Sequence, residues 1–380
     1  MNFTSKLPTV GTTIFTTMSK LAHEHKAINL AQGFPDFESD PLLQELVSKA
    51  MRDGHNQYAP MPGVYSLRER VTNKINTLYG SHYHPETDIT ITAGATQAIY
   101  TVVSTFIRPG DEVIILKPAY DCYEPAVQVN GGKVVPIQLE APDYKVDWKA
   151  VKKAITPKTK MLFINTPHNP TGTILGQSDL QELERIVDDT NIIVLSDEVY
   201  EHIVFDGKRH ESVARYPKLR ERSFITASFG KTFHNTGWKI GYAVAPKALM
   251  EEFKKVHQFN VFSVHHPSQK ALASYLEKDA HYLGLNAFFQ KKRDLFLDLI
   301  KGSRFKATPA AGTYFQMLDF SQITDEADTV FAERLTKENG LASIPTSVFN
   351  LDNKDFKMLR FCFAKEDEVL KKAAQILTSL

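Results

Sequence analysis

The chain has 380 residues, of which 45 are basic and 44 are acidic, so its formal net charge is +1 at pH 7. Hydrophobic residues make up 42% and charged residues 23%, a balance typical of soluble globular proteins. This charge balance gives no indication of a surface that attracts nucleic acid or an anionic membrane. The length predicts one large domain and one smaller domain.

The two cysteines, Cys122 and Cys362, are too few for a disulfide framework or a zinc site, so no metal is expected. Residues 1–20 lack the apolar run of a signal peptide, and no stretch is long and apolar enough to span a bilayer. We therefore expect a cytoplasmic protein. The basic run Lys291–Arg293 lies in a polar helical pattern and is predicted to form a solvated face.

Short apolar runs alternate with segments of helical periodicity through the middle of the chain. In chain order, the expected elements are a helix at Ala95–Arg108, strands at Glu112–Leu116 and Lys160–Asn165, a helix at Ser178–Asp189, strands at Ile192–Ser196 and Phe224–Ala227, and a helix at Pro246–Gln258. The strands are apolar on both faces, which is typical of a parallel sheet covered on both sides. The alternation predicts an α/β fold with a central, mostly parallel sheet flanked by helices.

Both ends of the chain depart from this alternation. The tail predicts a helix, strands around Gly312–Asp319 and Met358–Phe363, and a last helix at Asp367–Leu380. We therefore expect an N-terminal arm at residues 1–40 that joins the small domain, a large domain at residues 41–280, and a small α+β domain at residues 281–380.

Two segments offer groups suited to a phosphate and a flat ring. Gly94 permits close approach of the backbone just before a predicted helix, whose free N–H groups attract anions. Tyr120 follows the Glu112–Leu116 strand and can stack on a ring, although an aromatic side chain at such a place more often packs in a core or loop.

Polar groups also follow two apolar strands. Asp197 and Glu198 are adjacent in a strand, so they point to opposite faces and cannot both serve one site. Ligands bind at the carboxyl ends of parallel strands, where a carboxylate needs a cation such as a protonated pyridine nitrogen; capping of a helix by Asp197 is the competing interpretation. Asn169, held between Pro167 and Pro170, offers a donor and an acceptor, or belongs to a plain turn.

Two basic residues occur where apolar strands predict burial. Ser228–Lys231 follows a strand directly, and a partly desolvated lysine amine near other cations has a lowered pKa and attacks carbonyl groups. A surface lysine in a loop is the alternative. Arg360 lies within an apolar strand and shares its face with Cys362. A buried guanidinium needs a partner, and its planar fork matches either a substrate carboxylate or an internal Asp or Glu.

The order and spacing of these motifs resemble the fold-type I pyridoxal-5'-phosphate (PLP)-dependent aminotransferases of the broad aspartate aminotransferase class, from about Asn29 to Phe363. Within that class the chain is most similar to the kynurenine/glutamine aminotransferase group, and in that group to the bacterial methionine aminotransferase branch. The motifs that carry the resemblance are Asn29–Phe37 (NLAQGFPDF), Gln57–Tyr58, Tyr120–Pro125 (YDCYEP), Asn165–Gly172 (NTPHNPTG), Ser228–Lys231 (SFGK) through Gly237–Lys239 (GWK), and Leu359–Phe363 (LRFCF).

The resemblance implies a role for each matching residue. Lys231 would form a Schiff base with PLP, Asp197 would pair with its pyridine nitrogen, and Tyr200 would bind its ring oxygen, and these three are the expected catalytic residues. The other implied cofactor contacts are Gly94, Ala95, Thr96, Tyr120, Asn169, Ser228, Lys239 and Tyr58, with Tyr58 reaching across from the neighbouring subunit of a homodimer. The implied substrate contacts are Gly33, Asn169, Arg360, Phe15 and Phe262.

The resemblance implies a transaminase of class EC 2.6.1 that moves the α-amino group of methionine or of another apolar or aromatic amino acid to a 2-oxo acid by a ping-pong mechanism. His168, Ser263 and Phe15 stand where some members of the group carry Asn, His and Trp. These departures weaken the expectation of an aromatic oxo acid as substrate, as in the kynurenine–oxoglutarate aminotransferases.

Two other activities remain open. A PLP-dependent β-lyase acting on cysteine S-conjugates would share every cofactor residue. A PLP-sensing regulator would need a DNA-binding module, and the residues before 30 show no basic helix–turn–helix pattern.

Overall fold

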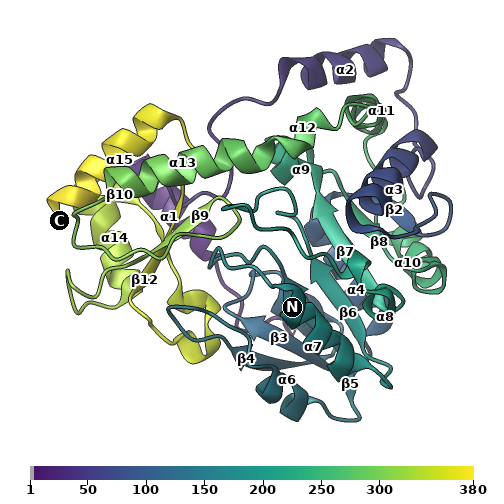
Figure 1. Cartoon of the computed structure of the whole chain (residues 1–380), viewed down its shortest axis with the longest axis horizontal. Coiled ribbons are helices and arrows are strands. Elements are labelled where there is room, and N and C mark those ends of the chain that lie inside the picture. The colour runs from purple at the N-terminus through teal and green to yellow at the C-terminus, as the bar shows by residue number, and fades with distance from the viewer. Residues whose placement is uncertain (1–3) are drawn as a thin grey trace.

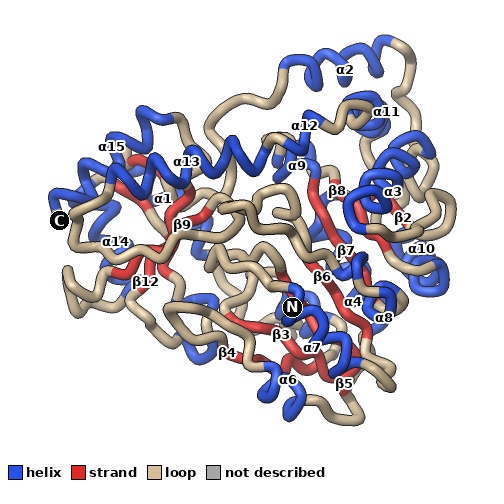
Figure 2. Tube along the Cα trace, in the orientation of Figure 1, coloured by secondary structure: helices blue, strands red, loops and turns tan. Residues whose placement is uncertain are grey.

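The computed structural model describes residues 4–380. A seven-stranded sheet lies at the centre of the larger part (Figures 1 and 2), with the strand order β2-β8-β7-β6-β5-β3-β4. β8 runs antiparallel to both of its neighbours, and the other strands pair in parallel. The strands are β2 (Ile89–Thr92), β3 (Glu112–Lys117), β4 (Lys133–Gln138), β5 (Thr159–Asn165), β6 (Ile193–Asp197), β7 (Ser223–Ser228) and β8 (Gly241–Val244).

Helices cover both faces of this sheet because successive strand residues point to opposite sides. Val113 and Ile115 of β3 pack into one core cluster with the helices α4 and α10, whereas Ile114 faces a second cluster that includes Leu183 of α7. The helices of this part are α2 (Pro41–Arg52), α3 (Tyr65–Tyr79), α4 (Gly94–Phe106), α5 (Tyr123–Val129), α6 (Trp148–Ala154), α7 (Gln177–Val187), α8 (Pro217–Arg220), α9 (Phe229–Thr232), α10 (Lys247–Asn260), α11 (His266–Tyr275), and the 3₁₀ helices η1 (Val213–Arg215) and η2 (Thr236–Trp238). The expected α/β fold is confirmed, and the predicted strands and helices of this part lie within two residues of the observed bounds.

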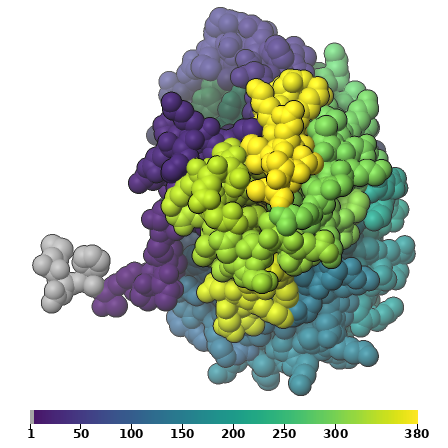
Figure 3. All heavy atoms as spheres, turned by 90° about the vertical axis from the view of Figure 1, so that its left-hand side faces the viewer, coloured from purple at the N-terminus to yellow at the C-terminus, as the bar shows by residue number. Residues whose placement is uncertain are grey.

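The C-terminal region forms a smaller α+β arrangement around a three-stranded antiparallel sheet of order β11-β12-β9. Its elements are α12 (Ala280–Leu283), α13 (Leu285–Leu299), β9 (Phe315–Asp319), α14 (Asp328–Asn339), β10 (Leu341–Ala342), β11 (Ile344–Pro345), η3 (Ser347–Phe349), η4 (Leu351–Asn353), β12 (Met358–Cys362) and α15 (Asp367–Ser379). Near the other end of the chain, α1 (Ile14–Glu24) contacts α14, and β1 (Ile28–Asn29) pairs in parallel with β10. Figure 3 shows the purple N-terminal segment lying against the yellow-green C-terminal region. The domain boundaries at residues 40 and 280 stay a prediction.

Every helix within residues 4–380 is too short or too polar to cross a bilayer. The same residues bring together no cluster of His, Cys, Asp and Glu that could hold a metal ion. A cytoplasmic location stays a prediction.

The basic run on α13 is not the solvated face that its polar pattern predicted. Only Lys291 is exposed, whereas Lys292 and Arg293 are buried. Arg293 donates to both carboxylate oxygens of Asp206, at 2.7 and 2.6 Å, and to the carbonyl oxygen of Ala310 at 2.7 Å. The prediction was wrong because α13 lies against the Asp206 loop, a neighbour that helical periodicity cannot reveal.

Replacing Arg293 with Met should therefore lower the thermal unfolding midpoint by about 3 °C, because the variant loses a bidentate ion pair whose guanidinium is buried and leaves the buried Ala310 carbonyl without its donor. Lys291→Met, two positions away on the exposed side of the same helix, is the matched control and should shift the midpoint by less than about 1 °C. Equal shifts in the two variants would contradict the assignment. Differential scanning calorimetry measures both.

Candidate active site

A cavity of about 710 Å³ opens where β5, β6 and β7 end, and their last residues Asn165, Asp197 and Ser228 all line it. Parallel strands end at one edge of a sheet, so side chains far apart in the sequence meet there. The lining residues are Gly94, Ala95, Thr96, Ile99, Tyr120, Asn165, Asn169, Asp197, Val199, Tyr200, Ser228, Lys231, Thr236 and Lys239. The structure thus brings together every residue expected to contact the cofactor except Tyr58.

Lys231 lies on α9, directly after β7, and its side chain enters the cavity from the sheet edge. Its Nζ donates to the carbonyl oxygen of Gly33 at 2.8 Å, an oxygen that also accepts from the Tyr314 hydroxyl at 2.7 Å. Burial lowers the pKa of Lys231 to about 8, and the positive charges of Arg360 and Lys239 act in the same direction. Roughly a tenth of this amine is therefore an uncharged nucleophile at pH 7, far more than for an ordinary lysine.

Asp197 is a buried carboxylate without a basic partner among the described residues. Its Oδ2 accepts from the hydroxyl of Tyr123 at 2.6 Å, and its Oδ1 accepts from the backbone N–H of Val199 at 3.2 Å. Burial raises the pKa of Asp197 to about 6, although the Tyr123 hydrogen bond opposes the shift. A cation placed in the cavity beside Asp197 would be strongly stabilised.

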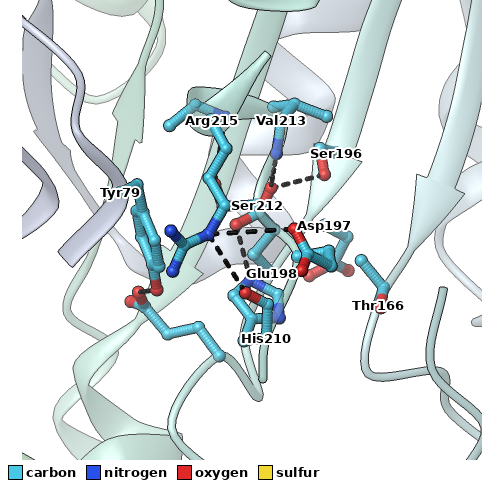
Figure 4. Close-up of polar contacts among 12 residues, drawn as sticks. Tyr79, Thr166, Ser196, Asp197, Glu198, His210, Ser212, Val213 and Arg215 are labelled. Atoms are coloured by element: carbon cyan, nitrogen blue, oxygen red, sulfur yellow. Dashed lines mark hydrogen bonds and ion pairs between the residues drawn. The ribbon is translucent and has the colours of Figure 1, made fainter. Parts of the chain in front are cut away.

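Glu198 points away from the cavity, as its strand position predicted. Figure 4 shows it among Ser196, His210 and Val213. Its Oε1 accepts from Ser196 Oγ at 2.8 Å and from the Val213 N–H at 3.2 Å, and its Oε2 lies 2.8 Å from His210 Nε2. Turn residues follow Asp197 in place of a helix, so helix capping does not explain it.

One end of the cavity is suited to a phosphate. The first turn of α4, with Gly94, Ala95 and Thr96, meets Ser228 and Lys239 there. A helix start supplies free N–H groups and a positive dipole end, and Lys239 adds a full charge. This close approach also requires a glycine at 241, a residue that sequence analysis missed: a Cβ at Gly241 would lie 2.9 Å from the Gly94 carbonyl carbon and 3.0 Å from the Ala95 nitrogen.

Arg360, on β12, is 1% exposed. Its Nη1 donates to Asn169 Oδ1 at 2.8 Å and its Nη2 donates to the Ala31 carbonyl at 3.0 Å, but its Nε has no partner. No carboxylate of residues 4–380 forms an ion pair with it, so the structure holds no internal salt bridge of the kind left open above. A buried guanidinium that lacks an acidic partner is suited to bind the carboxylate of a ligand.

The remaining predicted residues fall into two groups. Phe15 packs over Arg360, with its ring centroid 5.1 Å from the guanidinium carbon, and Gly33 contacts Lys231 through its carbonyl. Tyr58 and Phe262 pack edge to face on one another, with centroids 5.2 Å apart, and neither lines the cavity. They are 80% and 40% exposed, so one chain alone does not bring them to the site.

Tyr123 and Thr236 also belong to the site, although no role was predicted for either from the sequence. Tyr123 stands in the YDCYEP motif, three residues after Tyr120, and its position at the start of α5 is what directs its hydroxyl to Asp197. Thr236 lies in η2 between Lys231 and Lys239, a loop whose sequence carries no regular pattern.

Comparison with known proteins gives the family. The family model for aminotransferases of class I and II matches residues 25–377. The chain belongs to this family. It is 46% identical over 377 residues to the methionine aminotransferase of Escherichia coli K12, covering 99% of this chain and 98% of that protein. It is 32% identical over 411 residues to the kynurenine–oxoglutarate transaminase of Dictyostelium discoideum, covering 97% and 94%.

Solved structures agree with this assignment. The crystal structure of Escherichia coli YbdL, described as having a methionine aminotransferase function, superimposes with a TM-score of 0.98 at 46% identity over all of both chains. The maleate complex of Thermus thermophilus aspartate aminotransferase superimposes with a TM-score of 0.91 at 29% identity, also over all of both chains. The protein is therefore an aminotransferase of fold type I.

Aminotransferases of this family use PLP, and the described residues fit that group. Lys231 offers a buried amine for an aldehyde, and Asp197 offers a buried carboxylate for a protonated ring nitrogen. The start of α4, with Ser228 and Lys239, offers donors for a phosphate. Tyr120 lines the cavity from the loop after β3, where an aromatic ring can stack on a flat ligand.

The burial of Asp197 predicts a trade between stability and function in this aminotransferase. Because the pKa of Asp197 rises from 3.8 to about 6 on folding, ionisation of the carboxyl group is disfavoured in the folded state. The resulting penalty is absent below about pH 4, grows as the pH rises through this window, and is complete above it. Asp197→Asn should thus stabilise the cofactor-free protein by about 3 kcal/mol at pH 7.5 but by little at pH 4.

Chemical unfolding of the cofactor-free protein at the two pH values measures this difference, and Asp143→Asn, on an exposed loop carboxylate, is the control. The Asp197 variant should also bind PLP more weakly. Equal stability of the variant and the wild type at pH 7.5 would show that Asp197 carries no buried charge.

Proposed function

We propose that this aminotransferase binds PLP and transfers the α-amino group of methionine, or of another apolar or aromatic amino acid, to a 2-oxo acid. One observation carries the proposal: the site combines an amine and a guanidinium that both lack an acidic partner among the described residues. The amine of Lys231 has a lowered pKa, and the guanidinium of Arg360 is buried without a carboxylate beside it. An amine suits the cofactor aldehyde, and a guanidinium suits the α-carboxylate that all amino acids and 2-oxo acids share.

When bound, PLP supplies an aldehyde that condenses with amines and a protonated ring that withdraws electrons from the substrate α-carbon. Asp197 would hold the proton on the ring nitrogen, with Tyr123 fixing the orientation of its carboxylate. Tyr200 would donate to the ring oxygen, and Tyr120 would stack on the ring. Ala95, Thr96, Ser228 and Lys239 would hold the phosphate.

Substrate binding is assigned to Arg360 and Asn169. The Asn169 amide oxygen already accepts from one guanidinium nitrogen at 2.8 Å, which leaves the Nε–H free to donate to a carboxylate oxygen. The rings of Phe315 and Phe15, with centroids 3.9 and 5.1 Å from the guanidinium carbon, exclude water from it. The α-carboxylate is therefore bound in an environment of low polarity, where its attraction to the guanidinium is strong.

Lys231 is the proposed general acid–base. Once displaced by the substrate amine, Lys231 would use its Nζ to accept the proton of the substrate α-carbon as a base and to release it again as an acid. A pKa of about 8 suits both steps, because the uncharged amine accepts the proton and the charged form returns it near neutral pH. The same residue reverses the sequence with a second oxo acid, which gives ping-pong kinetics.

Lys231→Ala should lower kcat at least about 10³-fold, since no other described residue lining the cavity offers an amine at this position. The variant should still bind PLP through the phosphate and Asp197 contacts. The control is Lys218→Ala, which removes a lysine that is paired on the surface with Asp188 and should leave kcat unchanged. Full turnover by the Lys231 variant would refute the assignment.

The methionine preference rests on the 46% identical relative and on the aromatic surroundings of the site. Phe15 and Tyr120 present apolar faces, on which a thioether packs well. Mixing the PLP-loaded protein with methionine alone should release the 2-oxo acid without ammonia. Release of ammonia and a thiol from a cysteine S-conjugate would indicate the β-lyase reaction. Turnover of kynurenine but not methionine would indicate the activity named for the Dictyostelium relative.

We also propose a homodimer in which Tyr58 completes the phosphate site of the neighbouring subunit. Tyr58, Phe262 and Phe259 are exposed aromatic residues, 80%, 40% and 91% accessible in the single chain. Exposed apolar surface of this kind indicates an interface. The Tyr58 hydroxyl and Phe262 would then reach the partner's cavity, which explains why they do not line their own.

Subunit mixing tests this arrangement. Tyr58→Ala and Lys231→Ala homodimers should each be impaired, but a heterodimer of the two carries both defects in one site and neither in the other. Activity should therefore recover on mixing, toward half of the wild-type value per dimer. Absence of recovery, with heterodimers detected by native mass spectrometry, would place Tyr58 outside the shared site.

A further inference from the structure

A second cavity, of about 1440 Å³, lies beside the active-site cavity and shares Tyr120 with it. The N-terminal segment around Thr9–Thr13 forms one wall, and the loop that contains Asp121 forms another. Phe349 lines it too, and stacks on Phe15 with ring centroids 5.7 Å apart. Phe15 also packs over Arg360, so two stacked rings connect the wall of this cavity to the guanidinium proposed to hold the substrate carboxylate.

The charged side chains that line this second cavity are Lys117, Asp121 and Glu124. Lys117 and Glu124 form an ion pair with a separation of 2.6 Å, so their charges offset one another. Asp121 is partly buried, and within residues 4–380 its carboxylate forms no ion pair and accepts no hydrogen bond from another residue. One uncompensated negative charge is therefore left on the wall.

Arg360 is the basic residue that acts on this carboxylate. Burial raises the pKa of Asp121, and the positive charge of Arg360 lowers it, although the two groups form no ion pair. Asp121 directly follows Tyr120, which lines both cavities, and it leaves the guanidinium free for an incoming carboxylate. An amino acid held there by its α-carboxylate, with its α-carbon toward Lys231, would extend its side chain past Tyr120 into the cavity that Asp121 lines.

We propose that Asp121 is a specificity-determining residue that excludes amino acids and 2-oxo acids with a negatively charged side chain from this site. The inference rests on the proposed function, because it places the shared α-carboxylate on Arg360. A side-chain carboxylate in this cavity would face Asp121 without a free cation to offset the repulsion. Apolar and uncharged side chains meet no such penalty, so Asp121 and the aromatic residues select for the same substrates by different means.

The test compares glutamine with glutamate as amino donors, because the two differ in side-chain charge and little in shape. The PLP-loaded wild type, Asp121→Asn and Asp121→Glu are assayed, and the ratio of kcat/KM for glutamine to that for glutamate is taken. Any effect of Asp121 on the α-carboxylate at Arg360 is common to both substrates and cancels in this ratio. Asp121→Asn should lower the glutamine-to-glutamate ratio by about tenfold, which is on the order of a like-charge repulsion in a partly buried site. Asp121→Glu keeps the negative charge and should preserve most of the wild-type ratio.

Two further measurements use probes that need not be turned over. Glutarate should inhibit methionine turnover more strongly in Asp121→Asn than in the wild type. The monoamide of glutarate, in which a neutral amide replaces one carboxylate, should inhibit the two proteins equally. Raising the ionic strength should weaken the wild type's discrimination by screening the repulsion and should leave the Asn variant unaffected.

An unchanged glutamine-to-glutamate ratio and unchanged glutarate inhibition in Asp121→Asn, in protein that still turns over methionine, would overturn this inference and leave the proposed function standing. If the wild type converts no amino acid at all, the proposed function fails and this inference fails with it. A loss of discrimination in Asp121→Glu equal to that in Asp121→Asn would mean that shape and not charge is selected, which also overturns it.

Discussion

The burial of charged groups without opposite charges to pair with is the constraint on which this site depends. Asp197 and Arg360 are buried near the carboxyl edge of the sheet and Lys231 is half-buried there, and the charged form of each would be better solvated in water. The free energy that opposes their burial is recovered when ligands bind: a carboxylate would pair with Arg360, a protonated ring nitrogen would pair with Asp197, and an aldehyde would react with the uncharged amine of Lys231. The fold therefore stores binding energy for a cofactor and a substrate at the expense of the stability of the empty protein.

Keeping such groups in place requires a rigid surround. Asp197 is held by Tyr123 and by its own turn, while Glu198 anchors the opposite face of the same strand end through Ser196 and His210. The two adjacent carboxylates thus have separate tasks, one facing the ligand and the other tying β6 to η1. Together they explain why the end of this strand can carry two acidic residues.

The site also joins the two parts of the molecule. Arg360 comes from the C-terminal β12, but its guanidinium is oriented by Asn169 of the large sheet and by Ala31 of the N-terminal segment. Gly33 links that segment to Lys231 in turn. Any movement of the C-terminal region against the large sheet would therefore change the carboxylate site directly, and the ion pair of Arg293 with Asp206 restrains that movement.

The sequence by itself indicated four strands of the central sheet, since runs such as Ile192–Ser196 are apolar on both faces, as in a covered parallel sheet, whereas β2, β4 and β8 were not predicted. It also indicated the residues at the strand ends, because Asp197, Asn169 and Lys231 follow such runs directly. Only the tertiary structure decided what depends on contacts between distant segments: that Arg360 has no acidic partner, that Lys292 and Arg293 are buried, that Tyr123 holds Asp197, and that Tyr58 and Phe262 lie outside their own chain's cavity. The reason is physical: local patterning reports which face of an element is apolar, whereas the partner of a charged group is set by packing between elements that lie far apart in the sequence, as Arg360 and Ala31 do.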